Sequence, residues 1–370
     1  MQHVAIDLGG RESQICIRSE TGVILKEQRV RTSRLAAFFK TLEPSRVIVE
    51  TCAEAFAVAA SAQDAGHEVR VVPATLVKAL GVGARGIKTD IRDARCLSEA
   101  SARMDTLPSV HLPSKVSQET KAACGMRECL VESRTKLINS VRGWLRGRIM
   151  SIRGGGTETF PERVRAKFAE LDLAVPGMVE RQLVVIEALT AQIKEADKEL
   201  KELAMNDERC RRLMSVPGVG PIVGLRFLTA VDEVARFKDA HHLQSYFGLT
   251  PGENSSSDAR RRTHLTRAGS AQVRWTLVQA AWSAMRSRPS DPMVLWAKEI
   301  KKRRGPSIAA TALARKIAGI LFALLRNGST YVPLRGSSIR AEDLVLTSVS
   351  AARILDEART SAATTESSDA

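Results

Sequence analysis

The chain has 370 residues, of which 44% are hydrophobic, and a formal net charge of +15. That length is enough for two or three domains with separate cores, and no apolar run reaches the roughly 18 residues of a membrane span. The first residues show no export signal, and six scattered cysteines without a C-x-x-C pair argue against a zinc or disulfide framework. The protein is therefore expected in the cytoplasm.

The positive charge is concentrated in one segment. Residues 260–326 hold fifteen Lys and Arg against two acids, Asp291 and Glu299. A block of this kind is typical of nucleic-acid binding, although a solvated basic surface has the same composition. Because the chain has few aromatic residues, phosphate contacts rather than base stacking are expected to provide most of the affinity.

The first hundred residues alternate strand and helix patterns. Three strands are expected at HVAIDLGG, SQICIRS and GVILKEQRV. A helix (SRLAAFFKTL), a strand (SRVIVE), a helix (AEAFAVAASAQDAG) and a strand (HEVRVVP) follow. This order predicts a mixed α/β sheet flanked by helices, which we assign to residues 1–107.

Residues 108–207 are expected to form a helical arm. It follows a helix over KTDIRDARCLSEASARM and begins with a proline-marked linker. A basic helix pattern covers residues 115–150, and apolar residues recur at heptad spacing from Val179 to Leu203. The heptads predict a coiled coil between subunits or, equally well, an amphipathic helix packed in its own chain. Pairing of the two helices would make an antiparallel arm.

Residues 208–330 have a mainly α-helical pattern. SVPGVGP predicts a turn between two helices that resembles a helix-hairpin-helix. In such a turn the backbone N–H groups around Gly218 and Gly220 can bind a phosphate, although a plain connecting turn fits the spacing as well. Residues 331–370, which end in SAATTESSDA, are expected to be a largely disordered tail.

Four carboxylates form a candidate metal site. Asp7 and Glu50 end predicted strands, whereas Asp90 and Asp93 begin a predicted helix three residues apart. Converging carboxylates repel each other unless cations lie between them, and Mg²⁺ prefers oxygen ligands and suits phosphodiester chemistry. Each acid alone also fits a structural role, such as a solvated strand end or a helix-dipole partner. The IDLGG block also occurs in actin-like kinases, but no second phosphate-binding glycine motif follows.

The order of these blocks resembles one family. IDLGG, VIVE, KTDIRDA, SVPGVGP, YFGLTPGENSS and LTRAGSAQVRWTLVQAAW occur as in the DEDD insertion-sequence transposases, which include Piv-type DNA invertases. The similarity runs from residue 3 to about residue 325. The resemblance implies that residues 1–107 form an RNase H-like (RuvC-like) domain. It also implies that Mg²⁺ is held by a tetrad of Asp7, Glu50, Asp90 and Asp93.

The resemblance also implies a catalytic serine within residues 208–330. It would follow the GLTP turn at Ser255, with Ser256 as the alternative because Ser257 and Asp258 replace glycines usual in the family. Its hydroxyl would attack a DNA phosphodiester to leave a phosphoserine bond and a free 3′-OH, which conserves bond energy for rejoining. Four arginines are expected to bind nucleic acid and stabilise the developing charge: Arg260, Arg261, Arg262 and Arg267.

The expected function is therefore that of a transposase or site-specific recombinase that cuts and rejoins DNA. The resemblance implies a structured guide RNA (a bridge RNA) as a further partner. The heptads favour a homo-oligomer, either a dimer or a tetramer. In such an oligomer, Ser255 of one subunit would act with the tetrad of another. Two alternatives stay open: a metal-dependent Holliday-junction-type nuclease that acts by hydrolysis, and a non-catalytic nucleic-acid-binding protein.

Overall fold

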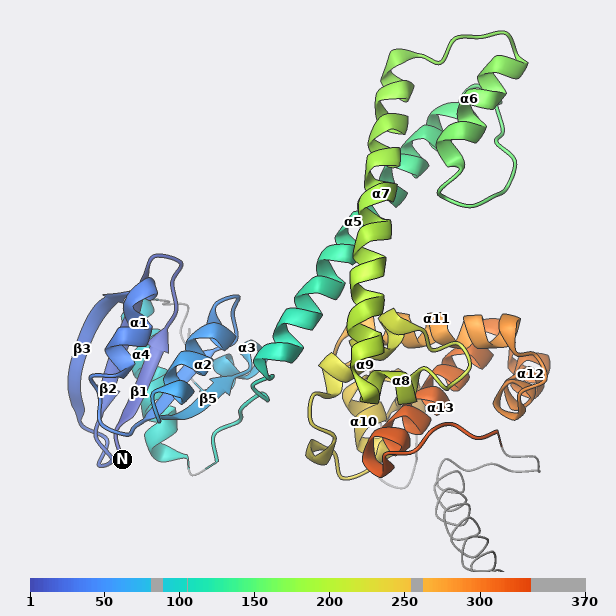
Figure 1. Ribbon diagram of the computed structural model, residues 1–370. Coiled ribbons are helices and arrows are strands. Elements are labelled where there is room, and N and C mark those ends of the chain that lie inside the picture. Colours follow the sequence, from blue (N-terminus) through green and yellow to red (C-terminus); the bar gives the residue numbers. More distant parts are fainter. Residues whose placement is uncertain (81–88, 105, 254–261, 334–370) are drawn as a thin grey trace, which may run out of the picture. The chain divides into compact units, whose positions relative to one another are not determined.

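The computed structural model describes residues 1–80, 89–104, 106–253 and 262–333. The chain divides into two compact units, Met1–Ser114 and Lys115–Ala370 (Figure 1). The first contains a mixed α/β sheet and the second is mainly helical, which confirms the expected order of an α/β unit followed by a mainly helical one. The part of the predicted disordered tail from residue 334 to residue 370 lies outside the described residues.

Five strands form the sheet of the first unit. They are β1 (His3–Asp7), β2 (Glu12–Arg18), β3 (Ile24–Arg31), β4 (Arg46–Glu50) and β5 (Glu68–Val72). Their order in the sheet is β3-β2-β1-β4-β5. The pairs β1–β2 and β2–β3 are antiparallel, whereas β1–β4 and β4–β5 are parallel. A meander thus leads into parallel strands joined through helices, as the element order predicts.

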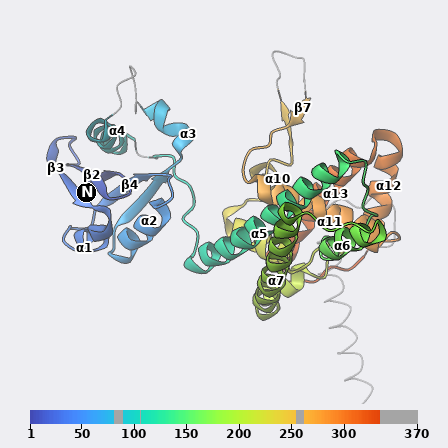
Figure 2. The ribbon, with the colours of Figure 1, turned by 90° about the horizontal axis from the view of Figure 1, so that it is seen from above.

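Helices cover both faces of this sheet. They are α1 (Leu35–Phe39), α2 (Ala55–Asp64), α3 (Ala74–Val77) and α4 (Asp90–Arg103). Figure 2 shows α4 on one face and α1 with α2 on the other. Val4 and Ile6 of β1 belong to the core formed with α1 and α2, whereas Ala5 belongs to the core that contains Leu97 of α4. The side chains of β1 therefore alternate between the two helix layers.

A helical arm begins the second unit. It consists of α5 (Lys115–Arg146), α6 (Phe160–Glu170) and α7 (Gly177–Asn206). Arg127 of α5 donates to Asp197 of α7 at 2.8 Å, and Arg134 donates to Thr190 at 3.3 Å. Residue numbers rise along α5 as they fall along α7, so the two helices pack antiparallel, as Figure 1 shows.

Part of the heptad stripe of α7 is buried within its own chain, whereas its last residue, Leu203, is 47% exposed. Four residues spaced by seven are at most 3% exposed: Val179, Ile186, Ile193 and Leu200. Val179 and Ile186 pack with Val141 and Leu145 of α5, and Leu200 packs with Cys124. An amphipathic helix on its own domain therefore accounts for this stripe. The antiparallel pairing of the two long helices is also confirmed.

Helices of different lengths and a β-hairpin follow the arm. They are α8 (Glu208–Leu213), α9 (Pro221–Val231), α10 (Ala240–Tyr246), β6 (Pro251–Glu253), β7 (Arg262–Leu265), α11 (Ala271–Ser287), α12 (Pro292–Arg304) and α13 (Pro306–Asn327). Helix α13 is long and apolar enough to cross a membrane, but 61% of its most apolar window is buried in the protein. It packs against α10, α11 and α12, so it is the central helix of this core.

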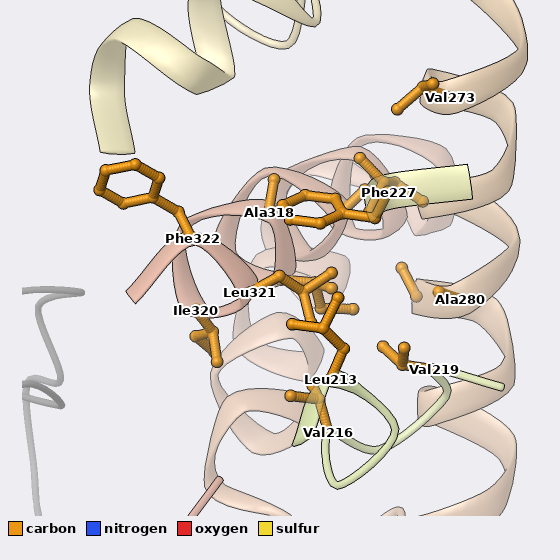
Figure 3. Packing of buried hydrophobic residues seen from close by; sticks show 14 of the residues in the cluster. Leu213, Val216, Val219, Phe227, Val273, Ala280, Ala318, Ile320, Leu321 and Phe322 are labelled. Atoms are coloured by element: carbon orange, nitrogen blue, oxygen red, sulfur yellow. The ribbon is translucent and has the colours of Figure 1, made fainter. Parts of the chain in front are cut away.

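The apolar residues of the SVPGVGP turn belong to this core. Figure 3 shows Val216 and Val219 pointing toward the same interior as Leu321 of α13 and Ala280 of α11. Val216 is 1% exposed and Val219 is 5% exposed. The turn between α8 and α9 is therefore anchored by burial of its side chains.

The six cysteines are thiols without disulfide bonds, and Cys52 and Cys129 are exposed. Cys124 and Cys210 lie in the core of the second unit. Burial raises the pKa of the Cys210 thiol to about 12. Because the thiolate is the reactive form of cysteine, this side chain acts as a small apolar core residue.

A buried ion pair joins the arm to the helices that follow it. Arg226 of α9 donates to the Glu128 carboxylate of α5 at 2.5 Å and to the Cys124 carbonyl oxygen at 3.0 Å. The side chains of Arg226 and Glu128 are 6% and 13% exposed. Removing one partner would leave the other charge buried without compensation.

The substitution Arg226→Met is expected to lower the free energy of unfolding of the second unit by about 3–5 kcal/mol. Urea denaturation followed by tryptophan fluorescence measures this unit selectively, because all four tryptophans follow residue 114. The matched control is Arg127→Met, which breaks a partly exposed pair with Asp197 and should cost about 1 kcal/mol or less. Equal losses in the two variants would contradict a special role for the buried pair.

Candidate functional site

Two of the predicted carboxylates lie at one edge of the sheet. Asp7 is the last residue of β1 and Glu50 is the last residue of β4, and these neighbouring strands are parallel. The register pairs Ile6 with Val49, so Asp7 and Glu50 occupy corresponding positions. Ala5 and Ile48 both face the α4 side. Because side chains alternate along a strand, Asp7 and Glu50 lie on that same face.

Helix α4 brings Asp93 to the same edge. Ser101 shares a 2.8 Å hydrogen bond with His3, and Ser98 donates to Cys16, which pairs with Ala5. Helix α4 therefore runs opposite to β1. Eight helical residues separate Ser101 from Asp93, or about 12 Å, and four strand residues separate His3 from Asp7, or about 13 Å. Asp93 thus lies level with the end of β1.

The two acids of α4 have different environments. Asp93 is 2% exposed, whereas Asp90 is the first residue of the helix and its side chain is 68% exposed. Arg29 of β3 approaches the Asp90 carboxylate at 3.9 Å. The Thr89 hydroxyl accepts from the Arg92 N–H at 3.3 Å and caps the helix. This cap fixes where α4 begins.

The four carboxylates suit a hard divalent cation by their chemistry. Their oxygens are the ligands that Mg²⁺ prefers, and three of them share one edge and one face of the sheet. In the described parts of the chain, however, no three His, Cys, Asp or Glu side chains lie close enough together to hold a metal ion. The fold therefore places three of the acids at the same edge of the sheet, but not close enough together to form a ligand set.

The glycines of the SVPGVGP turn have different structural roles. Gly218 has a φ of +83°, and a Cβ atom there would lie 2.1 Å from the Ala280 carbonyl oxygen. Glycine is therefore required at this position by close packing on α11. Gly220 precedes α9 as its N-cap and has open space around its Cα. The N-terminus of α9 beside Gly220 is therefore less crowded than the position of Gly218.

The predicted serine loop is flanked by a two-stranded hairpin. Ser255, Ser256, Arg260 and Arg261 lie outside the described residues. Strand β6 precedes them and β7 follows, with Pro251 paired to Leu265 and Glu253 paired to Arg262. The backbone of Arg262 thus belongs to β7. The two strands are antiparallel, so the ends of the intervening segment are held beside each other.

Close backbone packing fixes the base of this hairpin. Gly248 has a φ of +65°, and a Cβ atom there would lie 2.2 Å from the Ala268 carbonyl oxygen. Gly269 has a φ of +72°, and its Cβ atom would lie 2.1 Å from the Tyr246 carbonyl oxygen. The GLTP and TRAGS blocks therefore pack on each other, which explains why both need glycine.

Arg274 is a positioning residue that the sequence patterns do not identify. Its Nη1 donates to the carbonyl oxygens of Phe247, Ala268 and Gly269 at 3.3, 2.7 and 3.0 Å. One guanidinium on α11 thus joins the segments on both sides of the hairpin. Its position four residues after Ser270, the N-cap of α11, resembles an ordinary helix surface charge, so the pattern gave no indication of this role.

Comparison with known proteins identifies the family. A family model described as "Transposase IS116/IS110/IS902 family" matches residues 210–293, and a DEDD transposase model of the IS110 type matches residues 4–149. The chain is 31% identical over 332 residues to the putative transposase y4pF/y4sB of Sinorhizobium fredii, covering 86% of this chain and 83% of that protein.

Two further relatives are similar over most of their length. The transposase for insertion sequence element IS1111A of Coxiella burnetii is 27% identical over 337 residues, covering 89% of this chain and 90% of the relative. A probable family 20 transposase of Pseudomonas aeruginosa is 27% identical over 339 residues, covering 90% of this chain and 99% of the relative. The chain therefore belongs to the IS110/IS116/IS902 family of DEDD transposases, enzymes that bind element ends and cut and rejoin DNA.

Proposed function

We propose that this transposase cuts and rejoins DNA through a phosphoserine intermediate at Ser255, with a metal-binding tetrad of Asp7, Glu50, Asp90 and Asp93. The observation that carries the proposal is the common position of three acids. Asp7, Glu50 and Asp93 come from two parallel strands and one helix, yet they share one edge and one face of the sheet. Bringing these acids together around one site would be costly unless a cation offset their repulsion.

In this proposal the four carboxylates hold Mg²⁺, which when bound supplies Lewis-acid activation of the phosphodiester. The Ser255 oxygen forms a bond to phosphorus, and the bond between phosphorus and the 3′ oxygen breaks. The proton lost by the hydroxyl balances the proton gained by the 3′ oxygen, so a 5′-phosphoserine and a free 3′-OH result. A second 3′-OH then attacks the phosphoserine and releases Ser255 without ATP.

The basic residues are assigned to substrate binding. Arg267 follows β7 and has a φ of +53°, a conformation that is uncommon outside glycine. Together with Arg260, Arg261 and Arg262, it would stabilise the charge that develops on the phosphate. Gly218 shapes the turn before α9, and the N–H groups beside Gly220 would bind a DNA phosphate. These contacts would not depend on the DNA sequence, and they would fix the position of the DNA on the protein.

The partners proposed beyond DNA are a structured guide RNA and further copies of the chain, acting in the cytoplasm. A guide RNA would select sequences by base pairing, and the protein would recognise its backbone and A-form shape. The arm has basic residues suited to such contacts. In an oligomer, Ser255 of one subunit could act with the carboxylates of another.

Metal removal tests the proposed chemistry. Purified protein mixed with its proposed guide RNA and with DNA carrying its element ends and a target should form recombinant joints in Mg²⁺, and none after chelation. Restoring Mg²⁺ should recover the joints, which quantitative PCR across the junction measures. Undiminished joint formation in the chelator would contradict the metal-binding tetrad. Cut DNA with free 5′-phosphate ends and no joints would instead support a hydrolytic nuclease.

A further inference from the structure

A cavity lies beside the β-hairpin in the second unit. Its volume is about 840 Å³, which is within the range of ligand-binding pockets. Strands β6 and β7 contribute Pro251 and Leu265 to its wall, α12 contributes Trp296, and α13 contributes Ile308 and Ala312. The cavity therefore has an apolar interior formed by parts of the chain that are distant in sequence.

Helix α13 supplies one wall through regular spacing. Ser307, Thr311 and Arg315 recur every four residues, as do Ile308, Ala312 and Lys316. Residues four apart lie above one another on a helix, so these two adjacent rows form one continuous surface. Two hydroxyl groups, two cations and two apolar side chains thus share this wall.

The charge of the cavity is entirely positive among its described lining residues. None of these residues is acidic, and four are cations: Arg267, Arg304, Arg315 and Lys316. Gln244 is 8% exposed and orients Arg315 by accepting from its Nε at 2.9 Å and donating to its carbonyl oxygen at 3.1 Å. Such a cavity is complementary to an anion that carries an apolar group.

Trp296 gives the cavity an aromatic surface. The residue is 40% exposed, and the Lys316 ammonium lies 4.6 Å from the ring centroid. This cation–π contact holds the lysine next to the ring. Burial lowers the pKa of the Lys316 ammonium, and a bound anion would offset that desolvation. An aromatic face beside a partly desolvated cation is the combination that binds a base and its phosphate.

We propose that this cavity binds one nucleotide unstacked from the DNA strand that is cut, with its base against Trp296 and its phosphate among Arg304, Arg315 and Lys316. The inference rests on the proposed DNA cleavage, and it adds a subsite for a single unstacked base. A stacked duplex presents no free base face, so the nucleotide must leave the stack to enter. DNA is favoured over RNA because β6 and β7, which flank Ser255 in sequence, form part of the wall.

Photocrosslinking tests the subsite directly. The full-length protein would be irradiated with a single-stranded DNA oligonucleotide that carries 5-iodouracil, and the adducts would be mapped by mass spectrometry. We expect an adduct on Trp296 and none on Trp275 of α11, although Trp275 is the more exposed of the two at 54%. Adducts on Trp275 at equal or greater yield, or none on Trp296, would overturn the proposal.

Affinity measurements provide a second test of the subsite. Trp296→Leu should weaken binding of the unmodified oligonucleotide about tenfold, whereas Trp275→Leu should not change it. Ile308→Glu, at a position that is 47% exposed, places an acid in the cavity and should weaken binding without disturbing the core. Unchanged affinity in a folded Trp296→Leu or Ile308→Glu protein would overturn the proposal.

Two further comparisons separate base binding in the cavity from the serine chemistry and from RNA binding. The crosslinking needs no cleavage, so Ser255→Ala protein should give the same Trp296 adduct even if the serine mechanism is wrong. An RNA oligonucleotide with the same modified base should crosslink less efficiently than the DNA. Crosslinking of Trp296 to RNA alone would overturn the assignment to DNA and give the cavity to the guide RNA.

Discussion

Replacing Ser255 with alanine is expected to abolish the formation of recombinant DNA joints, with a loss in rate on the order of 10⁴-fold or more. The alanine side chain has no oxygen that can attack phosphorus, so the protein–DNA bond cannot form. Quantitative PCR across the recombinant junction measures the rate in purified reactions. Binding of the DNA itself should change little, because the positive charge of the protein is unchanged.

Ser256→Ala and Ser257→Ala are the matched controls, since they remove neighbouring hydroxyls from the same segment. Both variants should retain joint formation within a few fold of the unaltered protein. Loss of activity in Ser256→Ala with activity retained in Ser255→Ala would move the nucleophile by one residue. Normal activity in all three variants would contradict a serine mechanism.

The substitution Asp93→Asn is expected to lower the rate of joint formation about 10³-fold, which corresponds to the loss of several kcal/mol of metal-dependent stabilisation. The amide has nearly the same shape as the carboxylate but lacks its charge, so the buried position can keep its packing. The measurement is joint formation over a range of Mg²⁺ concentrations. The control is Glu99→Gln on the same helix, which breaks an exposed pair with Arg103 and should leave activity unchanged.

Mixing the two inactive proteins shows where the site is completed. If Ser255 of one subunit acts with the tetrad of another, a mixture of Ser255→Ala and Asp93→Asn proteins should recover part of the activity. No recovery in any mixture would show that each site is completed within one chain. Full activity of Asp93→Asn alone would contradict the role of this carboxylate.

The sequence patterns predicted the first unit in detail. Each of the five strands and each longer helix of that unit occurs where the sequence indicates it. In the inner strands β1, β2 and β4, burial on two faces of the sheet constrains nearly every residue, whereas the edge strand β3 has no buried residue. The positions of Asp7 and Glu50 at strand ends followed from the same spacing. The contrast between buried Asp93 and exposed Asp90 did not, since residues three apart share a side of a helix but face different neighbours.

The second unit was predicted less completely. Heptad spacing in α7 indicated burial but not its partner, because the same stripe suits another subunit or α5. The hairpin β6–β7 is too short, at three and four residues, to give an alternating pattern. The contacts of Arg274 with three carbonyl oxygens and the pairing of Arg226 with Glu128 depend on the fold, since their partners are set by packing between distant segments.

The most direct test of the central claim is to identify the residue that becomes joined to DNA. Cells carrying the protein and its flanking DNA would be lysed under denaturing conditions, and the DNA that remains attached to protein would be analysed by mass spectrometry. We predict a 5′-phosphate linked to Ser255 that is lost in both Ser255→Ala and Asp90→Ala proteins. Cut DNA with free 5′-phosphates and no protein adduct would contradict the phosphoserine mechanism.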